Sequence, residues 1–442
     1  MPVRSTGSHV VIDCLCLRPK VCRYGKGVVV MIKQIDGGVT AAQGFQAAGA
    51  AAGIKYENRK DMALVYTREP AVAAGTFTTN VVKAAPVLWD KELIGKSKPF
   101  HAVVLNSGIA NACTGEEGKK NNAWMAAAVA EELSVSTQEV LTCSTGVIGM
   151  QLNMGPVKKG AKLLKEALSD TREAARAAAE AIMTTDTCPK ECAAEFEVEG
   201  KKVIVGGMSK GSGMIHPDMA TMLSVITTDA CIGQELLAET LRNVVGDTFN
   251  MISVDRDTST NDTCIVLANG MSGIPEIKKG TESYEAFRGA LLHVARELAK
   301  QMAGDGEGCT KLLEVKVENA VTVEAAKQLS KSVITSNLVK TAVYGSDANW
   351  GRILCALGYA GVKFDPEKVD LTICAEGEEG MESIVLVKDG VATGYSEEEA
   401  TKLLSQSEVS VVCDMKQGTA AAVAWGCDLT YDYVKINGDY RS

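Results

Sequence analysis

The sequence is poor in the residues on which much enzyme chemistry depends. Its 442 residues include only four histidines, His9, His101, His216 and His293, and aromatic residues make up 5%. No HExxH motif and no histidine–cysteine group with the spacing of metal ligands occurs, so no metal site is expected. No run of about 18 apolar residues occurs either, so the sequence predicts no membrane span.

Nucleotide-binding and hydrolase motifs are also absent. Nothing matches the P-loop, and the glycines of "GDGEGCTK" at 304–311 lack the GxGxxG order and follow a predicted helix. The GxSxG turn that presents a nucleophilic serine does not occur. With 46 basic against 55 acidic residues and a net charge of −9, the chain lacks the basic footprint of a nucleic-acid-binding protein. We therefore expect no organic cofactor and no nucleic-acid partner.

Cysteine pairs of the CxxC type are missing, although the chain has 14 cysteines. In a chain of this length, scattered cysteines indicate reduced thiols in a cytosolic protein rather than a disulfide framework. Residues 1–30 hold five basic side chains against the single acid Asp13. They are either an organelle transit segment or an upstream artefact with Met31 as the true start. We expect a cytoplasmic protein, or an organellar one if the first interpretation holds.

The rest of the chain alternates predicted strands and helices, which is typical of an α/β fold. Apolar runs predict strands at 61–67, 101–108 and 222–228, and a hairpin over 195–208 that turns at Glu199–Gly200. Helical patterns cover 121–133, 156–183, 234–249 and 284–302. The alternation restarts at residue 311 with a strand at 312–318 and a helix at 324–332. We predict an N-terminal extension (1–30), a catalytic α/β domain (31–310) and a smaller C-terminal α/β domain (311–442).

One stretch near the middle, "GGMSKGSGMIHPDMATMLSVITTDA" at 206–230, combines a glycine-rich loop with a buried strand. A threonine at a chain N-terminus can use its own α-amino group, whose pKa is about 7.7–8.0, as a base. Thr221 would reach that state if its hydroxyl attacked the Ala220 carbonyl and water cleaved the resulting ester. A plain loop entering a sheet explains the same letters. His216 is a second candidate base, although no acid is placed beside it in the sequence.

The same segment, "KGSGMIHPDMATMLSVITTDA", resembles the self-cleavage segment of the glutamate N-acetyltransferase (ornithine acetyltransferase) family. Further matching blocks run in one order from about residue 33 to 442: "GGVTAAQGFQAAG", "FTTNVVKAAPV", "NSGIANACTG", "STGVIG", "DTSTNDT", "EGCTK", "LVKTAVYGSDANWGR" and "YVKINGDYRS". The resemblance implies the layered sheet-and-helix sandwich of the self-cleaving transferases and aminopeptidases, with scission between Ala220 and Thr221. It also implies ping-pong transfer of acetyl from N-acetylornithine to glutamate through an acetyl-Thr221 ester. Whether acetyl-CoA is a second donor stays open.

The resemblance also implies a set of site residues. Thr145 and Gly146 of "STGVIG" match the oxyanion hole. The substrate contacts match Thr184, Lys210, Thr221, Glu307, Asn437 and Ser442. Lys210 and Thr184 suit an α-carboxylate, whereas Glu307 and Asn437 suit the side-chain ammonium of ornithine. The cleaved chains of relatives pair as an α2β2 particle, without a metal or cofactor.

Some positions depart from the family pattern, and two other functions stay open. Ile109 stands where the family usually has asparagine, Arg256 where glycine is common, and Ala348 and Asn337 where proline is common. None of these positions carries a site role. A self-cleaving aminopeptidase would also show two fragments but would leave glutamate unacetylated. A binding or scaffold protein would stay as one intact chain.

Overall fold

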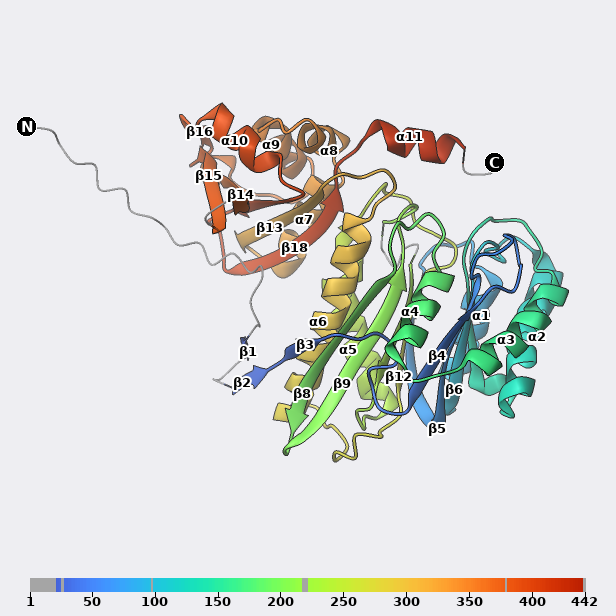
Figure 1. Ribbon diagram of the computed structural model, residues 1–442. Coiled ribbons are helices and arrows are strands. Elements are labelled where there is room, and N and C mark those ends of the chain that lie inside the picture. The colour runs from blue at the N-terminus through green and yellow to red at the C-terminus, as the bar shows by residue number, and fades with distance from the viewer. Residues whose placement is uncertain (1–20, 25–27, 97, 217–221, 378–379, 440–442) are drawn as a thin grey trace, which may run out of the picture.

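Two large β-sheets, stacked end to end with helices around them, build the molecule (Figure 1). The computed structural model describes residues 21–24, 28–96, 98–216, 222–377 and 380–439. Within these ranges, no helix is long and apolar enough to cross a membrane. The mixed α/β architecture confirms the predicted fold class.

The first sheet has nine strands in the order β3-β8-β9-β10-β12-β5-β6-β7, with β4 also paired to β5. Their bounds are β3 (Lys33–Ile35), β4 (Phe45–Ala50), β5 (Met62–Phe77), β6 (Phe100–Asn106), β7 (Val140–Ser144), β8 (Lys190–Val198), β9 (Lys201–Lys210), β10 (Leu223–Thr228) and β12 (Thr263–Ala268). At its centre β10 runs parallel to β12 and antiparallel to β9. Every residue of β10 and β12 is buried, as expected for strands with both faces covered.

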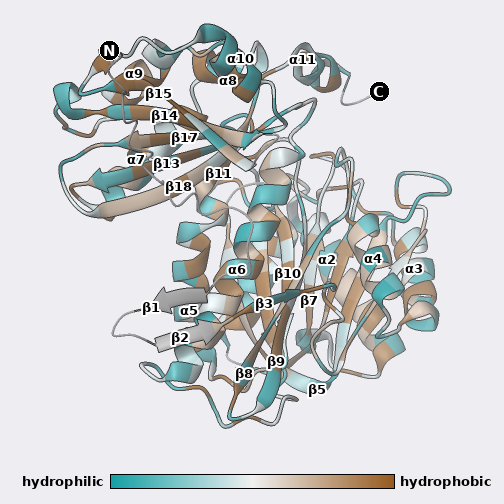
Figure 2. Cartoon of the chain, turned by 60° about the vertical axis from the view of Figure 1, so that its left-hand side comes forward, coloured by the Kyte–Doolittle hydropathy of each residue, from teal (hydrophilic) through white to brown (hydrophobic). Residues whose placement is uncertain are grey.

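Helices cover the nine-stranded sheet and fill the space between its layers. They are α1 (Ala85–Gly95), α2 (Gly115–Leu133), α3 (Met154–Ala167), α4 (Arg172–Ala181), α5 (Gln234–Asp247) and α6 (Glu282–Gly304). The long helix α6 packs on β8 and β9, and α4 packs on β4 and β5. Figure 2 shows the central strands largely in brown, between helices that turn their teal faces outward. The apolar core therefore lies on both faces of the sheet.

The second sheet has seven strands in the order β11-β18-β13-β17-β14-β15-β16. They are β11 (Ile252–Ser253), β13 (Leu312–Ala320), β14 (Asp370–Gly377), β15 (Gly380–Lys388), β16 (Val391–Ala392), β17 (Glu408–Asp414) and β18 (Ala420–Cys427). Its helices are α7 (Val323–Ile334), α8 (Asn337–Tyr344), α9 (Trp350–Gly358), α10 (Glu397–Leu404) and α11 (Tyr431–Gly438). A short pair, β1 (Val21–Tyr24) and β2 (Val28–Met31), forms a separate hairpin. The domain boundary at residue 310 stays a prediction, which limited proteolysis would test.

The single helix predicted over 156–183 is wrong, because the chain forms α3 and α4 with a break between them. At the break Ser169 exchanges two backbone hydrogen bonds with Ala47 of β4, at 2.8 and 3.1 Å. The hydroxyl of Thr171 then accepts from the backbone N–H of Ala174 and caps α4. A pairing partner more than 100 residues away thus interrupts a segment whose composition is helical throughout.

Other local predictions are confirmed. The hairpin β8–β9 turns at Glu199 and Gly200, which have φ of +50° and +77°, the left-handed pair of a two-residue hairpin. Helix α6 covers the predicted range 284–302, and α5 covers the predicted range 234–249 except its last two residues. Strand β5 is much longer than predicted, since it continues past Pro70 through a register shift between Tyr66 and Ala71.

Candidate active site

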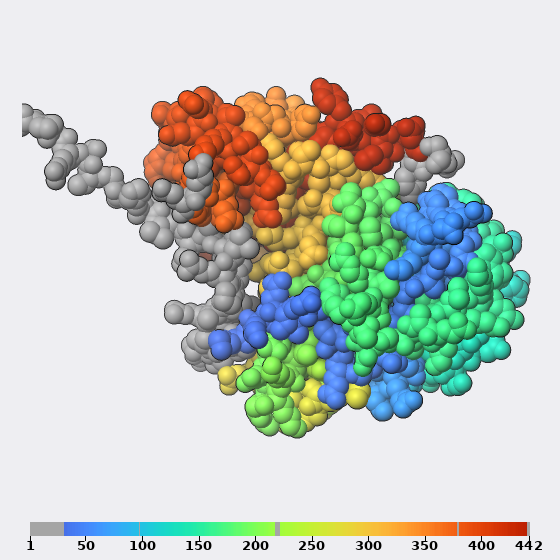
Figure 3. All heavy atoms as spheres, viewed as in Figure 1, coloured from blue at the N-terminus to red at the C-terminus, as the bar shows by residue number. Residues whose placement is uncertain are grey.

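The candidate site lies where β9 ends and the chain returns as β10. Lys210 is the last residue of β9 and pairs with Leu223 at the start of β10. The predicted cleavage pair Ala220–Thr221 falls between them, and both residues lie outside the described part of the chain, as does Ser442. Figure 3 shows the dark red residues of α11 at the top of the molecule, next to the gold and green segments that carry this site.

Lys210 brings two of the predicted site residues together. Its Nζ donates to the hydroxyl of Thr184 at 2.9 Å and to that of Thr145 at 3.4 Å. The side chain is almost fully buried. Burial lowers the pKa of the Lys210 ammonium, and the carboxylates of Asp186 and Glu307 only partly oppose that effect. The site thus holds a cation that would gain stability from an anionic ligand.

Lys210 lies beside a buried network of ion pairs. The ammonium of Lys190 is fully buried and contacts Asp186 at 2.7 Å and Asp305 at 2.5 Å. Asp186 also accepts from the backbone N–H groups of Gly211 and Thr184. Burial alone would raise the pKa of Asp186, but Lys210 and Lys190 hold it well below its usual range. Asp186 therefore stays ionised and fixes the segments that carry Thr184 and Lys210.

The turn after β7 carries Thr145 and Gly146, the two residues predicted to form an oxyanion hole. Gly146 has φ of +130°, and a Cβ there would overlap the backbone of Gly108, so only glycine fits. The neighbouring N–H groups of Thr145 and Val147 donate to Asn106 O and Gly108 O at 3.0 and 3.1 Å. In the part of the chain that the structure describes, no acceptor takes the Gly146 N–H. That N–H and the Thr145 hydroxyl remain as donors for a ligand.

Two residues that sequence reasoning did not single out hold this turn against β10. The amide of Asn261 donates to Ala110 O at 2.6 Å and to Ser144 O at 2.7 Å. The carboxyl of Asp262 accepts from the backbone N–H of Met222 at 3.0 Å. Burial raises the pKa of Asp262 well above its usual value, against the opposing effect of that hydrogen bond. The run of polar residues "DTSTNDT" ahead of a buried strand could have indicated them, because buried polar side chains are nearly always hydrogen-bonded to other parts of the structure.

Glu307 and Asn437 form the other end of the site. Asn437, on α11, donates from its side-chain nitrogen to Glu307 Oε2 at 2.8 Å. The backbone N–H of Glu307 donates to Ser212 O at 3.0 Å, which ties the loop after α6 to the segment after β9. Gly213 leaves room for the carboxylate, since a Cβ there would overlap it. The side chain of Glu307 is buried. Its contact with Asn437 connects the loop after α6 to α11, the helix that follows the second sheet.

The segment just before residue 217 is fixed by the loop that precedes Asn261. Asp255 accepts from the backbone N–H groups of Met214 and Ile215 at 2.6 and 2.8 Å. His216 points one ring nitrogen at the Ser253 hydroxyl at 3.1 Å, and its carbonyl accepts from Thr258. Arg256, at a position where the resemblance leads one to expect glycine, has φ of +72°.

Comparisons with known proteins show the family to which the chain belongs. The family model for the ArgJ family matches residues 46–442. The chain belongs to the ArgJ family. The "arginine biosynthesis bifunctional protein ArgJ" of Symbiobacterium thermophilum is 50% identical over 412 residues, covering 92% of this chain and 99% of that protein. The "glutamate N-acetyltransferase" of Methanocaldococcus jannaschii is 48% identical over 421 residues, covering 93% and 100%.

Solved structures of relatives match as well. The ornithine acetyltransferase of Mycobacterium tuberculosis, complexed with ornithine, is 40% identical, with a TM-score of 0.40, covering 44% of this chain and 100% of that chain. The ArgJ protein of Bacillus halodurans is 43% identical, with a TM-score of 0.46, covering 48% and 97%. From its family and curated relatives, this ArgJ protein is an acetyltransferase of arginine biosynthesis.

Proposed function

We propose that this protein transfers acetyl from N-acetylornithine to glutamate through an ester on Thr221, after self-cleavage between Ala220 and Thr221. The observation that carries the proposal is the contact of Lys210 with both Thr145 and Thr184 at the end of β9. This contact supports a carboxylate-binding role for Lys210 next to the proposed oxyanion turn. Lys210 also pairs with Leu223, at the start of the strand that Thr221 would precede as a new N-terminus.

The first half-reaction uses the two functional groups of Thr221 and the donors of the Thr145–Gly146 turn. The neutral α-amino group of Thr221 takes the proton of its own hydroxyl as the oxygen attacks the acetyl carbonyl. The Gly146 N–H and the Thr145 hydroxyl donate to the developing oxyanion, a contribution of about 3–4 kcal/mol per donor. The protonated amine then delivers its proton to the departing nitrogen of ornithine, leaving acetyl on Thr221.

Binding of the two substrates follows from the charges at each end. Lys210 and Thr184 receive the α-carboxylate that N-acetylornithine and glutamate share. Glu307, held by Asn437, accepts from the ornithine ammonium. Glutamate carries a side-chain carboxylate at that end, and the side-chain amide of Asn437 donates a hydrogen bond to it. Ser442 completes the set, and removal of residues 440–442 tests its part.

Cleavage and acetyl transfer are tested together by intact-mass measurement of the purified protein, with and without N-acetylornithine. We expect two chains that end at Ala220 and begin at Thr221, and an added acetyl group on the second chain. Thr221→Ala should stay as one chain, whereas Thr221→Ser keeps a hydroxyl and should still cleave. An uncut wild-type chain that transfers acetyl would overturn the proposal.

The acceptor, the assembly and the location need separate measurements. Incubation with N-acetylornithine and glutamate should yield N-acetylglutamate, whereas release of free amines from peptides without it would identify an aminopeptidase. An assay with acetyl-CoA and glutamate decides whether this chain has a second donor. We further propose an α2β2 assembly in the cytoplasm, which native mass measurement and localisation of the tagged full chain would check.

A further inference from the structure

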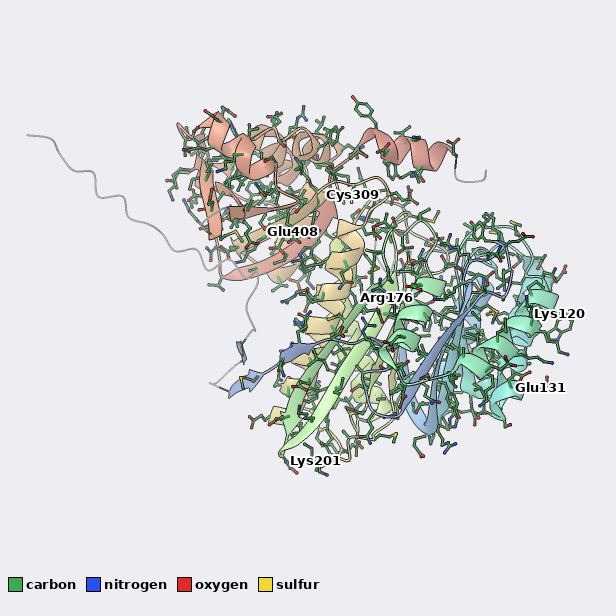
Figure 4. All side chains as sticks on the ribbon, in the orientation of Figure 1. Lys120, Glu131, Arg176, Lys201, Cys309 and Glu408 are labelled. Atoms are coloured by element: carbon green, nitrogen blue, oxygen red, sulfur yellow. The ribbon has the colours of Figure 1, made fainter. Side chains whose placement is uncertain are left out.

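Two cysteine thiols meet directly behind the loop that carries Glu307. Cys309 follows α6 and the glycine loop, and Cys427 is the last residue of β18. The two thiols interact directly, although the residues are far apart in the sequence. Cys427 Sγ packs against Gly306, whose carbonyl accepts from the backbone N–H of Cys309 at 2.9 Å. In Figure 4, the labelled Cys309 lies at the upper end of α6, where the two sheets meet. The catalytic scheme above uses neither thiol.

The two cysteines differ in access. Cys427 is 1% exposed. Cys309 is half-buried and lines a cavity of about 460 Å³, together with Thr187, Gly306, Lys435 and Asp439. A small reagent can therefore reach Cys309 from the cavity, while Cys427 is reached only through Cys309.

The surroundings favour a thiolate on the buried partner. The interaction with the Cys309 thiol lowers the pKa of Cys427 to about 7, burial opposes this, and the nearby ammonium of Lys340 assists. Lys340 Nζ lies 3.5 Å from Cys427 Sγ. Gly306 packs closely against Cys427 Sγ, since a Cβ at that glycine would lie 2.8 Å from the sulfur. The pair thus combines an accessible thiol with a resolving thiolate in contact with it.

We propose that Cys309 and Cys427 form a reversible thiol–disulfide modification site that controls the placement of Glu307. The oxidant is a low-molecular-weight disulfide, RSSR. As RSSR enters the cavity, the Cys309 proton passes to Cys427, Cys309 Sγ bonds one sulfur of RSSR, and RS⁻ leaves. That RS⁻ takes the proton back from Cys427, whose thiolate then attacks Cys309 Sγ and expels the second RS⁻. The protein loses two electrons, and RSSR is reduced to RSH and RS⁻.

Oxidation must move the loop. A disulfide needs its sulfurs about 2.05 Å apart, closer than any hydrogen-bonded pair of thiols. It also removes the S–H that Cys309 donates to Gly304 O at 3.1 Å, at the end of α6. Two residues from Cys309, Glu307 depends on its contacts with Asn437 and Ser212. A shift of this size at a positioning group can lower kcat/KM by about 100-fold, and we expect at least about tenfold here.

The effect on activity rests on the proposed acetyl transfer, whereas the disulfide itself does not. The full protein is incubated with oxidised glutathione, its free thiols are alkylated, and the digest is mapped by mass while acetyl transfer is assayed on the same sample. We expect a crosslinked peptide pair containing Cys309 and Cys427, a parallel loss of kcat/KM, and recovery with dithiothreitol. Cys309→Ala should keep its activity under oxidant, and Cys355→Ala, which removes an exposed distant thiol, should behave like wild type.

Three outcomes would overturn the proposal. In one, glutathione adds to exposed cysteines but no peptide links Cys309 to Cys427. In another, the link forms and kcat/KM does not change, which removes the control of Glu307. In the third, Cys309→Ala loses activity with oxidant as wild type does. If reduced wild type transfers no acetyl at all, the proposed function fails, and the peptide map still decides the disulfide.

Discussion

At the scale of single residues, two buried lysines have opposite electrostatic situations. Lys190 lies between two carboxylates, and although burial opposes its charge, Asp186 and Asp305 raise its pKa. Lys210 is separated from Asp186 by 3.9 Å, and burial dominates, so its pKa is lowered. The charge of Lys190 is thus compensated by the protein itself, whereas the charge of Lys210 is compensated only in part. This difference supports a structural role for Lys190 and the proposed ligand-binding role for Lys210.

Replacing Lys190 should test the structural role. Lys190→Met leaves Asp186 and Asp305 buried without their main partner, which should cost about 3–5 kcal/mol and lower the unfolding temperature. Because the pKa of Asp186 is depressed in the folded state, its stabilising effect is full above the unfolded value of about 3.9 and is lost as pH falls below it. The difference between variant and wild type should therefore shrink in acid. Lys202→Met, which removes an exposed ion pair with Glu195, should change stability by no more than about 1 kcal/mol.

Lys210 should impose a pH dependence on substrate binding. In the proposed scheme the ammonium form of Lys210 binds the substrate carboxylate. Because its pKa lies below the ordinary 10.5, KM for N-acetylornithine should begin to rise at a pH below that value. A KM profile from pH 7 to 10.5 measures this directly. Lys210→Met should raise KM at every pH and flatten the profile. A wild-type KM that stays constant across this range would remove Lys210 from carboxylate binding.

At the scale of elements, the sequence predicts what is local and misses what distant pairing imposes. The hairpin at Glu199–Gly200 and the helices α5 and α6 follow from turn chemistry and apolar periodicity. The break before α4 and the extension of β5 past Pro70 depend on partners that no local window contains. The site shows the same division. Thr145, Lys210 and Glu307 were predicted from a family resemblance. The contacts of Lys210 with Thr145 and of Glu307 with Asn437 are seen only in the fold.

The turn after β7 can be tested with a matched pair of glycines. Gly146→Ala has no room, because the new Cβ would overlap the Gly108 backbone, and the displaced N–H could not face an oxyanion. We expect kcat to fall by about 10²- to 10³-fold, the effect of losing one oxyanion donor. Gly149→Ala also places a side chain at positive φ, +85°, but meets nothing within 4 Å. It should cost about 1 kcal/mol of stability and leave kcat unchanged. Equal losses of kcat in both variants would contradict the assignment.

At the scale of the whole molecule, the site depends on contact between the two sheets. Asn437 comes from α11, which follows the second sheet, and it reaches Glu307 on the loop after α6. The hydroxyl of Thr430 donates to Gly308 O at 2.6 Å, and Asp428 accepts from the backbone of Thr310 at 2.8 Å. The C-terminal segment is thus attached to the Glu307 loop along its length. The Glu307 end of the candidate site is therefore complete only when both halves of the molecule are in contact.

A buried lysine ties two neighbouring strands of the second sheet together at their ends. Lys340, on α8, is 3% exposed and donates to Val254 O and Cys427 O, each at 2.7 Å. Val254 leads into the loop that holds residues 214–216 and ends at Asn261. Lys340→Met keeps the length of the side chain but leaves two buried carbonyl groups without this donor, at about 1–3 kcal/mol each.

We therefore expect Lys340→Met to unfold at a lower temperature and to lose acetyl transfer before it unfolds, because the loop through Val254 supports the site. The measurement pairs thermal unfolding with kcat/KM at a temperature where the variant is still folded. Lys363→Met, which replaces an exposed lysine of the same half, should leave both unchanged. If Lys340→Met unfolded early yet kept full kcat/KM in its folded state, the contact would serve stability alone. The active site would then be organised within the first sheet and α11.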